Sequence, residues 1–176
     1  MRVRTLLLAS ALGASAIAFD APARADDTNV VQPAVLGQRY AARRQGMFAT
    51  LGAWSMVSMG GGGALAFGGT NDFDRFFGVQ ALAWGAVNLA FSIFGVAQSK
   101  TELFTGPDAA DAVKKDRASL AKVFWINAIL DIGYVIAGTL LWNLGANDIV
   151  RGTGAGIVAQ GGFLFAFDSV GYTLSR

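Results

Sequence analysis

The sequence predicts an all-α protein, an integral membrane four-helix bundle built from two tandem, parallel helical-hairpin repeats. Two observations support this fold class. Residues 48–100 and 124–176 align without a gap, and 14 of the 53 aligned positions are identical, more than three times what this composition gives by chance. The chain is also only 15% charged and 53% hydrophobic, whereas soluble domains carry about 25% charged residues. Each copy is therefore expected to be a hydrophobic hairpin.

The repeat predicts how the helices pack. In lipid, helices associate through small residues that let their backbones approach closely. Small and polar residues recur at alternating spacings of three and four, which keeps them on one stripe of each helix. We expect these four stripes to form the interior of the bundle. The predicted packing positions are Gly52, Gly62, Gly78, Gly85, Gly95, Gly138, Gly154, Gly161 and Gly171.

Composition excludes several classes of function. The chain has no Cys and no His, so it has no thiolate nucleophile and lacks the most common general base and metal ligand. Its net charge is only +2, and no long basic run indicates a nucleic-acid surface. We therefore expect no metal, no cofactor, no nucleic-acid partner and no enzymatic activity.

The N-terminus resembles a secretory signal. Arg2 and Arg4 precede an apolar stretch at 5–19, and Ala23-Arg24-Ala25 forms a small-residue cleavage site. The prediction is a cleaved signal peptide at 1–25, with an uncleaved first anchor as the alternative. A polar and poorly ordered N-terminal tail at 26–45 is expected to follow.

The remaining chain divides into two hairpins and a linker. The first transmembrane hairpin occupies 46–100, with spans at about 47–68 and 76–98. A hydrophilic linker helix at 101–121 is expected to continue into the second hairpin, 122–176, whose spans lie at about 121–144 and 152–174. Short polar turns connect the spans of each hairpin, and Asn71 or Asp72 is suited to cap the helix after the first turn. The glycine run at 60–63 predicts close packing or a kink.

Two features of the sequence predict opposite orientations of the protein in the membrane. A leader at 1–25 places both termini and the linker outside the cytoplasm. The positive-inside rule favours the opposite, because nine basic residues would then be external and only Arg75 and Arg151 internal. Since leader recognition acts first, we expect a multi-pass protein of the bacterial inner membrane with periplasmic termini.

Two carboxylates interrupt the apolar spans. A charge at the bilayer centre costs about 2.5–3.5 kcal/mol on insertion scales, so Asp131 and Asp168 require an explanation. Their equivalents in the first copy are Ser55 and Ser92. One hypothesis is a proton or cation site, since a shared proton or a bound cation would relieve repulsion between two nearby carboxylates. The alternative is that neighbouring groups satisfy each carboxylate separately. The candidate ion-pathway residues are Asp131, Asp168, Asn127, Asn88, Ser92 and Tyr134.

Short motifs in the first copy add a resemblance. Arg44-x-Gly46-Met47 and Leu51-Gly52-x-Trp54 precede Trp84-Gly85-x-Val87-Asn88-Leu89 in the next helix. Over about 44–96 this pattern resembles a group of uncharacterised bacterial four-helix membrane proteins, a domain of unknown function. The resemblance implies the fold and no activity, and it does not extend to Asp131 or Asp168.

Three hypotheses follow for function. The first is a non-enzymatic membrane protein of structural or accessory type, with lipid as its partner and self-association into a homo-oligomer. The second is a small proton or cation channel or carrier that uses Asp131 and Asp168. A lipid-modifying enzyme with an Asp base is the third, and the absence of His and Cys disfavours it.

Overall fold

The computed structural model describes residues 33–176, which form four α-helices and one short 3₁₀ helix. The elements are α1 (Pro33–Gly68), α2 (Asp72–Ala97), η1 (Thr101–Phe104), α3 (Ala109–Leu144) and α4 (Asp148–Ser175). The all-helical class and the four main helices are therefore confirmed. The signal peptide predicted at 1–25 and the first part of the tail lie outside the described residues.

The first helix begins earlier than the sequence predicted. Residues 33–45, expected to be a poorly ordered tail, form the first turns of α1. Pro33 suits the first position of a helix because its missing N–H needs no partner there. Ala41 then packs with Phe104 of η1 and Val113 of α3 in a small buried cluster. This tertiary contact with the linker explains why the segment is ordered.

Each hairpin closes with the same turn. The Asn71 side chain accepts a hydrogen bond from the backbone N–H of Asp74, and Asn147 does the same for Val150. Arg75 and Arg151 each donate from Nε to a glycine carbonyl of their turn, at 2.9 Å. The asparagine cap predicted for the first turn is confirmed and recurs in the second, and the two arginines hold the turns.

Within each hairpin the helices meet at glycines, as the repeat predicted. A Cβ on Gly78 would lie 2.5 Å from the Gly62 carbonyl oxygen, and one on Gly154 would lie 2.7 Å from that of Gly138. The other predicted packing glycines also face the partner helix of their own hairpin. Gly52 meets Ser92, Gly85 meets Met59, Gly95 meets Phe48, Gly161 meets Val135 and Gly171 meets Phe124.

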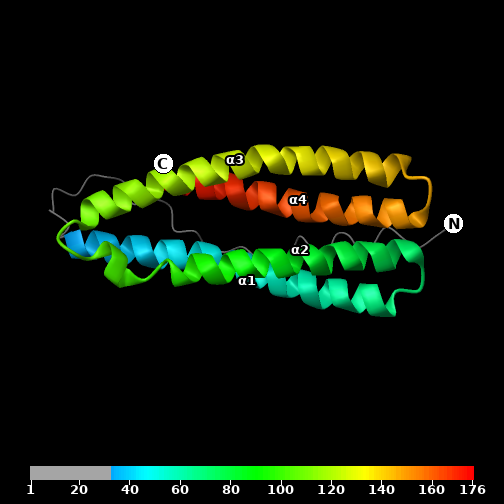
Figure 1. Ribbon diagram of the computed structural model, residues 1–176, viewed down its shortest axis with the longest axis horizontal. Helices are drawn as coiled ribbons and strands as arrows, with labels where there is room; N and C mark the ends of the chain where they lie inside the picture. The colour runs from blue at the N-terminus through cyan, green and yellow to red at the C-terminus, as the bar shows by residue number, and fades with distance from the viewer. Residues whose placement is uncertain (1–32) are drawn as a thin grey trace. The chain divides into compact units, whose positions relative to one another are not determined.

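The predicted single bundle interior is replaced by two hairpin interfaces. The glycine stripe of α2 packs on α1, and that of α4 packs on α3. The two hairpins instead join through other faces of α2 and α4, which contact each other. Both tight turns lie at the same end of the described bundle (Figure 1). The two copies are therefore parallel, as the sequence predicted.

An approximate twofold axis relates the hairpins. At the offset of 76 positions, Ser58 is equivalent to Tyr134 and Trp84 is equivalent to Gln160. Ser58 of the first hairpin contacts Gln160 of the second, and Tyr134 of the second hairpin likewise contacts Trp84 of the first. Gln80 and Gly156 are equivalent to each other, and they touch: a Cβ on Gly156 would lie 2.7 Å from the Gln80 Cβ. The axis thus passes between these two residues. Sequence analysis missed Gly156, although buried small residues recur on this face of α4 at Gly152 and Gly156.

Polarity is distributed unusually between interior and surface. Ser55 is fully buried and Asn88 and Gln160 are 3% exposed, whereas Phe67 is 85% and Leu144 is 77% exposed. Of the helices in 33–176, α2 and α3 are long and apolar enough to cross a membrane. The other two main helices, α1 and α4, do not reach that level.

Candidate functional site

The structure brings Asp131 and Asp168 together. Asp131 of α3 and Asp168 of α4 are 3% and 4% exposed, and their side chains lie within hydrogen-bonding reach of each other. The Asn127 amide, one turn before Asp131 on α3, also reaches Asp168. One carboxylate oxygen of Asp131, Oδ2, has no partner among the described residues. Three of the six predicted pathway residues therefore lie in one cluster, in which both acids are buried. We call Asp131 and Asp168 the acid pair.

The equivalent positions of the first hairpin explain what is special about this cluster. Ser55 donates to the Leu51 carbonyl at 2.7 Å, and Ser92 donates to the Phe48 carbonyl at 2.8 Å. A serine hydroxyl can donate a hydrogen bond to a backbone carbonyl of a helix, whereas an ionised carboxylate only accepts hydrogen bonds. At the acid pair, Asn127 lies beside the Asp168 carboxylate. A proton or cation between the two acids would supply the remaining attraction.

The other three predicted pathway residues lie elsewhere. Ser92 bonds to Phe48 inside the first hairpin, so it does not reach the acid pair. Asn88, on the same stripe of α2, is buried and its Nδ2 has no hydrogen-bond partner in 33–176. Tyr134 is 41% exposed and packs edge-on against Trp84, with ring centroids 5.4 Å apart. The acid pair is therefore smaller than the polar pocket that the sequence suggested.

A separate polar contact joins the two hairpins. Trp54 donates from Nε1 to Gln160 at 2.9 Å, and Gln160 donates onward to the Ser58 hydroxyl at 3.1 Å. Trp54 also stacks on Phe163, with ring centroids 4.2 Å apart. Gln160 therefore forms hydrogen bonds between helices of different hairpins.

Sequence analysis missed a buried ionic cluster near the start of α1. Arg44 is 8% exposed and donates from Nη1 to the Gly95 carbonyl and to the Ser99 hydroxyl. Its Nε lies 2.9 Å from the Asp116 carboxylate, which also accepts a 2.6 Å hydrogen bond from the Tyr40 hydroxyl. Burial, then the hydrogen bond to Asp116 and its charge, raise the pKa of Tyr40. Tyr40 therefore stays protonated and keeps donating.

This cluster, comprising Tyr40, Arg44, Ser99 and Asp116, ties three segments together. Arg44→Gln is expected to lower the free energy of unfolding by about 2 kcal/mol, because it removes the ion pair with Asp116 and the charged donor to Gly95 and Ser99. The neighbouring Arg43→Gln, at an exposed position, is the matched control and should change stability by less than about 0.5 kcal/mol. Equilibrium unfolding in detergent micelles measures both. Equal stability of the two variants would contradict the role given to Arg44.

Fold and interior together define an all-helical protein of two tandem hairpins that carries a buried acid pair in the second hairpin. It belongs to the family of unknown function DUF6992, whose model matches residues 50–169. This match extends across both hairpins, whereas the resemblance seen in the sequence covered the first. Searches of curated proteins and of solved structures gave no match.

Proposed function

We propose that this chain is a four-span integral membrane protein of structural or accessory type, without catalytic chemistry. The observation that supports the proposal is the inverted polarity of the bundle. Large apolar side chains cover its surface, and small or polar residues fill its interior. In water such a surface favours association or aggregation. In lipid it is the expected surface, because small residues and interhelical hydrogen bonds drive helix packing there.

The charges support the same proposal. Within 47–71, 76–99, 123–147 and 152–175, the charged residues are Asp131 and Asp168, and both are buried. Each segment is long enough for a hydrocarbon core of about 30 Å. Although α1 and α4 do not reach the hydropathy of a membrane span, exposed residues such as Met56, Val57 and Phe165 give them apolar outer faces. We place the protein in a bacterial inner membrane with periplasmic termini and allow for self-association there.

Thiol accessibility tests this topology. Because the sequence contains no Cys, only the introduced thiol can be labelled. Lys115 lies near the start of α3 and Asp148 at the start of α4, so they occupy opposite ends of the second hairpin. Lys115→Cys and Asp148→Cys would each be probed with a membrane-impermeant reagent on intact spheroplasts. We expect Cys at 115 to label and Cys at 148 to label only after permeabilisation. The reverse pattern would keep four spans but invert the orientation, and labelling of both on intact cells would contradict the proposal.

A second function is favoured by the proximity of Asp131 and Asp168. The pair could hold a proton or a monovalent cation within the membrane, as a carrier or channel of small size would require. Its support is the unpartnered Asp131 Oδ2 beside a second carboxylate. The parallel repeat argues against the inverted-repeat architecture that many transporters use. We therefore rank this function second.

A further inference from the structure

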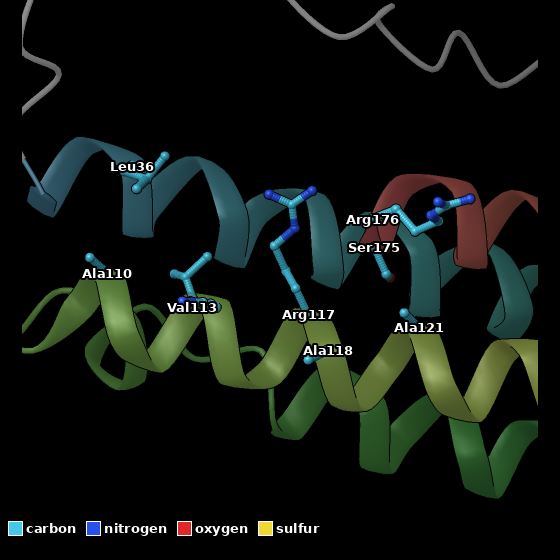
Figure 2. A pocket seen from close by; sticks show the side chains of 9 residues that line it. Leu36, Ala110, Val113, Arg117, Ala118, Ala121, Ser175 and Arg176 are labelled. Carbon is cyan, nitrogen blue, oxygen red and sulfur yellow. The ribbon is translucent and has the colours of Figure 1, made fainter.

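A groove lined by three cations lies between the start of α3, the start of α1 and the end of α4. It has a volume of about 500 Å³. Lys114, Arg117 and Arg176 contribute the charges, and Val113, Ala118 and Ala121 are among the apolar residues that line it. Figure 2 shows these walls, with the Arg117 side chain extending from α3 toward α1 and Arg176 at the end of α4. We call this site the basic groove.

Within residues 33–176, no acidic side chain lines the basic groove. The ion pair within 33–176 joins Arg44 to Asp116, and the Asp116 carboxylate is already engaged by Tyr40. Lys114, Arg117 and Arg176 therefore have no carboxylate partner in the described part of the chain. Three cations facing one concave surface attract an anion with several oxygen acceptors.

The residues next to the basic groove indicate its depth relative to a membrane. Immediately after Ala121 and Lys122, the outer face of α3 becomes apolar, with Val123, Trp125 and Ile126 exposed. Trp125 packs against Tyr172 of α4 with ring centroids 5.5 Å apart, and the Arg176 guanidinium lies over the Tyr172 ring. Tryptophan and tyrosine mark the headgroup level of membrane proteins. If the chain spans a bilayer as proposed above, the basic groove lies at the level of lipid phosphates.

We infer that the basic groove binds the phosphate of an anionic phospholipid, whose acyl chains lie along the adjoining apolar faces of α3 and α4. This inference rests on the proposed membrane location. Arginine presents a fork of donors that matches phosphate oxygens, and lysine adds a point charge. Basic pockets between helices at a membrane surface recognise anionic headgroups in this way. The apolar lining and the adjacent apolar belt accommodate the chains of a lipid, which a free phosphate ion would leave uncovered.

The test compares two triple variants of the full chain. Lys114→Gln, Arg117→Gln and Arg176→Gln together remove the groove charges. Arg39→Gln, Arg43→Gln and Lys100→Gln remove the same net charge from exposed positions near the same end of the bundle. Each protein would be reconstituted in vesicles of phosphatidylcholine and phosphatidylglycerol, extracted in mild detergent, and examined for retained lipid by native mass spectrometry. Inorganic phosphate would be added as a competitor.

The wild type is expected to retain phosphatidylglycerol in preference to phosphatidylcholine, and the control triple to match it. The groove triple should bind phosphatidylglycerol about tenfold more weakly or worse, since each basic residue near the surface adds attraction. Equal loss in both triples, or displacement of phosphatidylglycerol by millimolar inorganic phosphate, would overturn the lipid site. Flotation of the vesicles separates the proposed membrane location from the proposed lipid site. If the wild type floats with neutral vesicles but shows no lipid preference, the lipid site alone is overturned. A wild type that does not float overturns both.

Discussion

Gly154→Leu is expected to destabilise the second hairpin by about 3 kcal/mol, one of the largest effects in the molecule. A Cβ at this position would collide with the Trp142 backbone nitrogen and lie 2.7 Å from the Gly138 carbonyl oxygen. Both obstacles are main-chain atoms, so no side-chain rotation relieves the overlap. The two helices would have to separate, and their close contact would be lost.

Gly162→Leu provides the matched control on the same helix. A Cβ at Gly162 meets nothing within 4 Å, and leucine favours a helix over glycine by about 1 kcal/mol. Titration of micelle-embedded protein with sodium dodecyl sulfate, followed by tryptophan fluorescence, gives the unfolding midpoints. We expect Gly154→Leu to unfold earlier than wild type and Gly162→Leu to unfold at the same point or later. If both behave alike, the backbone contact between α3 and α4 does not determine hairpin stability.

Replacing both acids, Asp131→Asn with Asp168→Asn, is expected to reduce proton- or cation-driven flux to the level of protein-free vesicles if the second proposed function holds. Asparagine keeps the shape and the hydrogen-bonding capacity of each side chain. It can neither release a proton at accessible pH nor neutralise a cation by charge. The double variant should therefore fold with wild-type helix content while losing transport. Flux of a pH-sensitive or ion-sensitive dye in reconstituted vesicles measures the effect.

The first hairpin offers the control for this experiment, because Ser55 and Ser92 occupy the equivalent positions. Ser55→Ala with Ser92→Ala removes polar groups at the same depth without touching a carboxylate, and it should leave flux unchanged. Equal flux in the wild type, the acid variant and the serine variant would contradict the carrier or channel hypothesis and leave the structural or accessory role. Wild-type protein that conducts nothing would lead to the same conclusion.

The helices and their glycine contacts could be predicted from the sequence because both depend on local periodicity. A stripe at alternating spacings of three and four stays on one helix face whatever the topology. The same reasoning predicted the asparagine cap of the first turn. The side chain accepts a hydrogen bond from a backbone N–H three residues later, so the cap depends only on the local sequence. That Asp131 and Asp168 lie close together was one of two hypotheses that the sequence left open.

The contacts between hairpins were not predictable in this way. The stripe of α2 contains both Asn88 and Ser92, and the sequence does not say that it faces α1 and not the acids of the second hairpin. Gly156 went unnoticed because α4 carries small residues on more than one face. Arg44 was missed for a different reason. Its partners include a backbone carbonyl and an aspartate far along the chain, and neither leaves a signature near Arg44.

The approximate axis between Gln80 and Gly156 has a consequence for what one chain can hold. A homodimer of a single hairpin must place the same residue on both sides of its axis, so two glutamines would collide there and two glycines would leave a gap. Covalent linkage of two divergent copies removes that restriction, and here a long side chain fills the space above a glycine. The same freedom lets serines occupy one hairpin and carboxylates the other. A symmetric dimer of the acidic hairpin would bury four carboxylates, whereas this chain buries two.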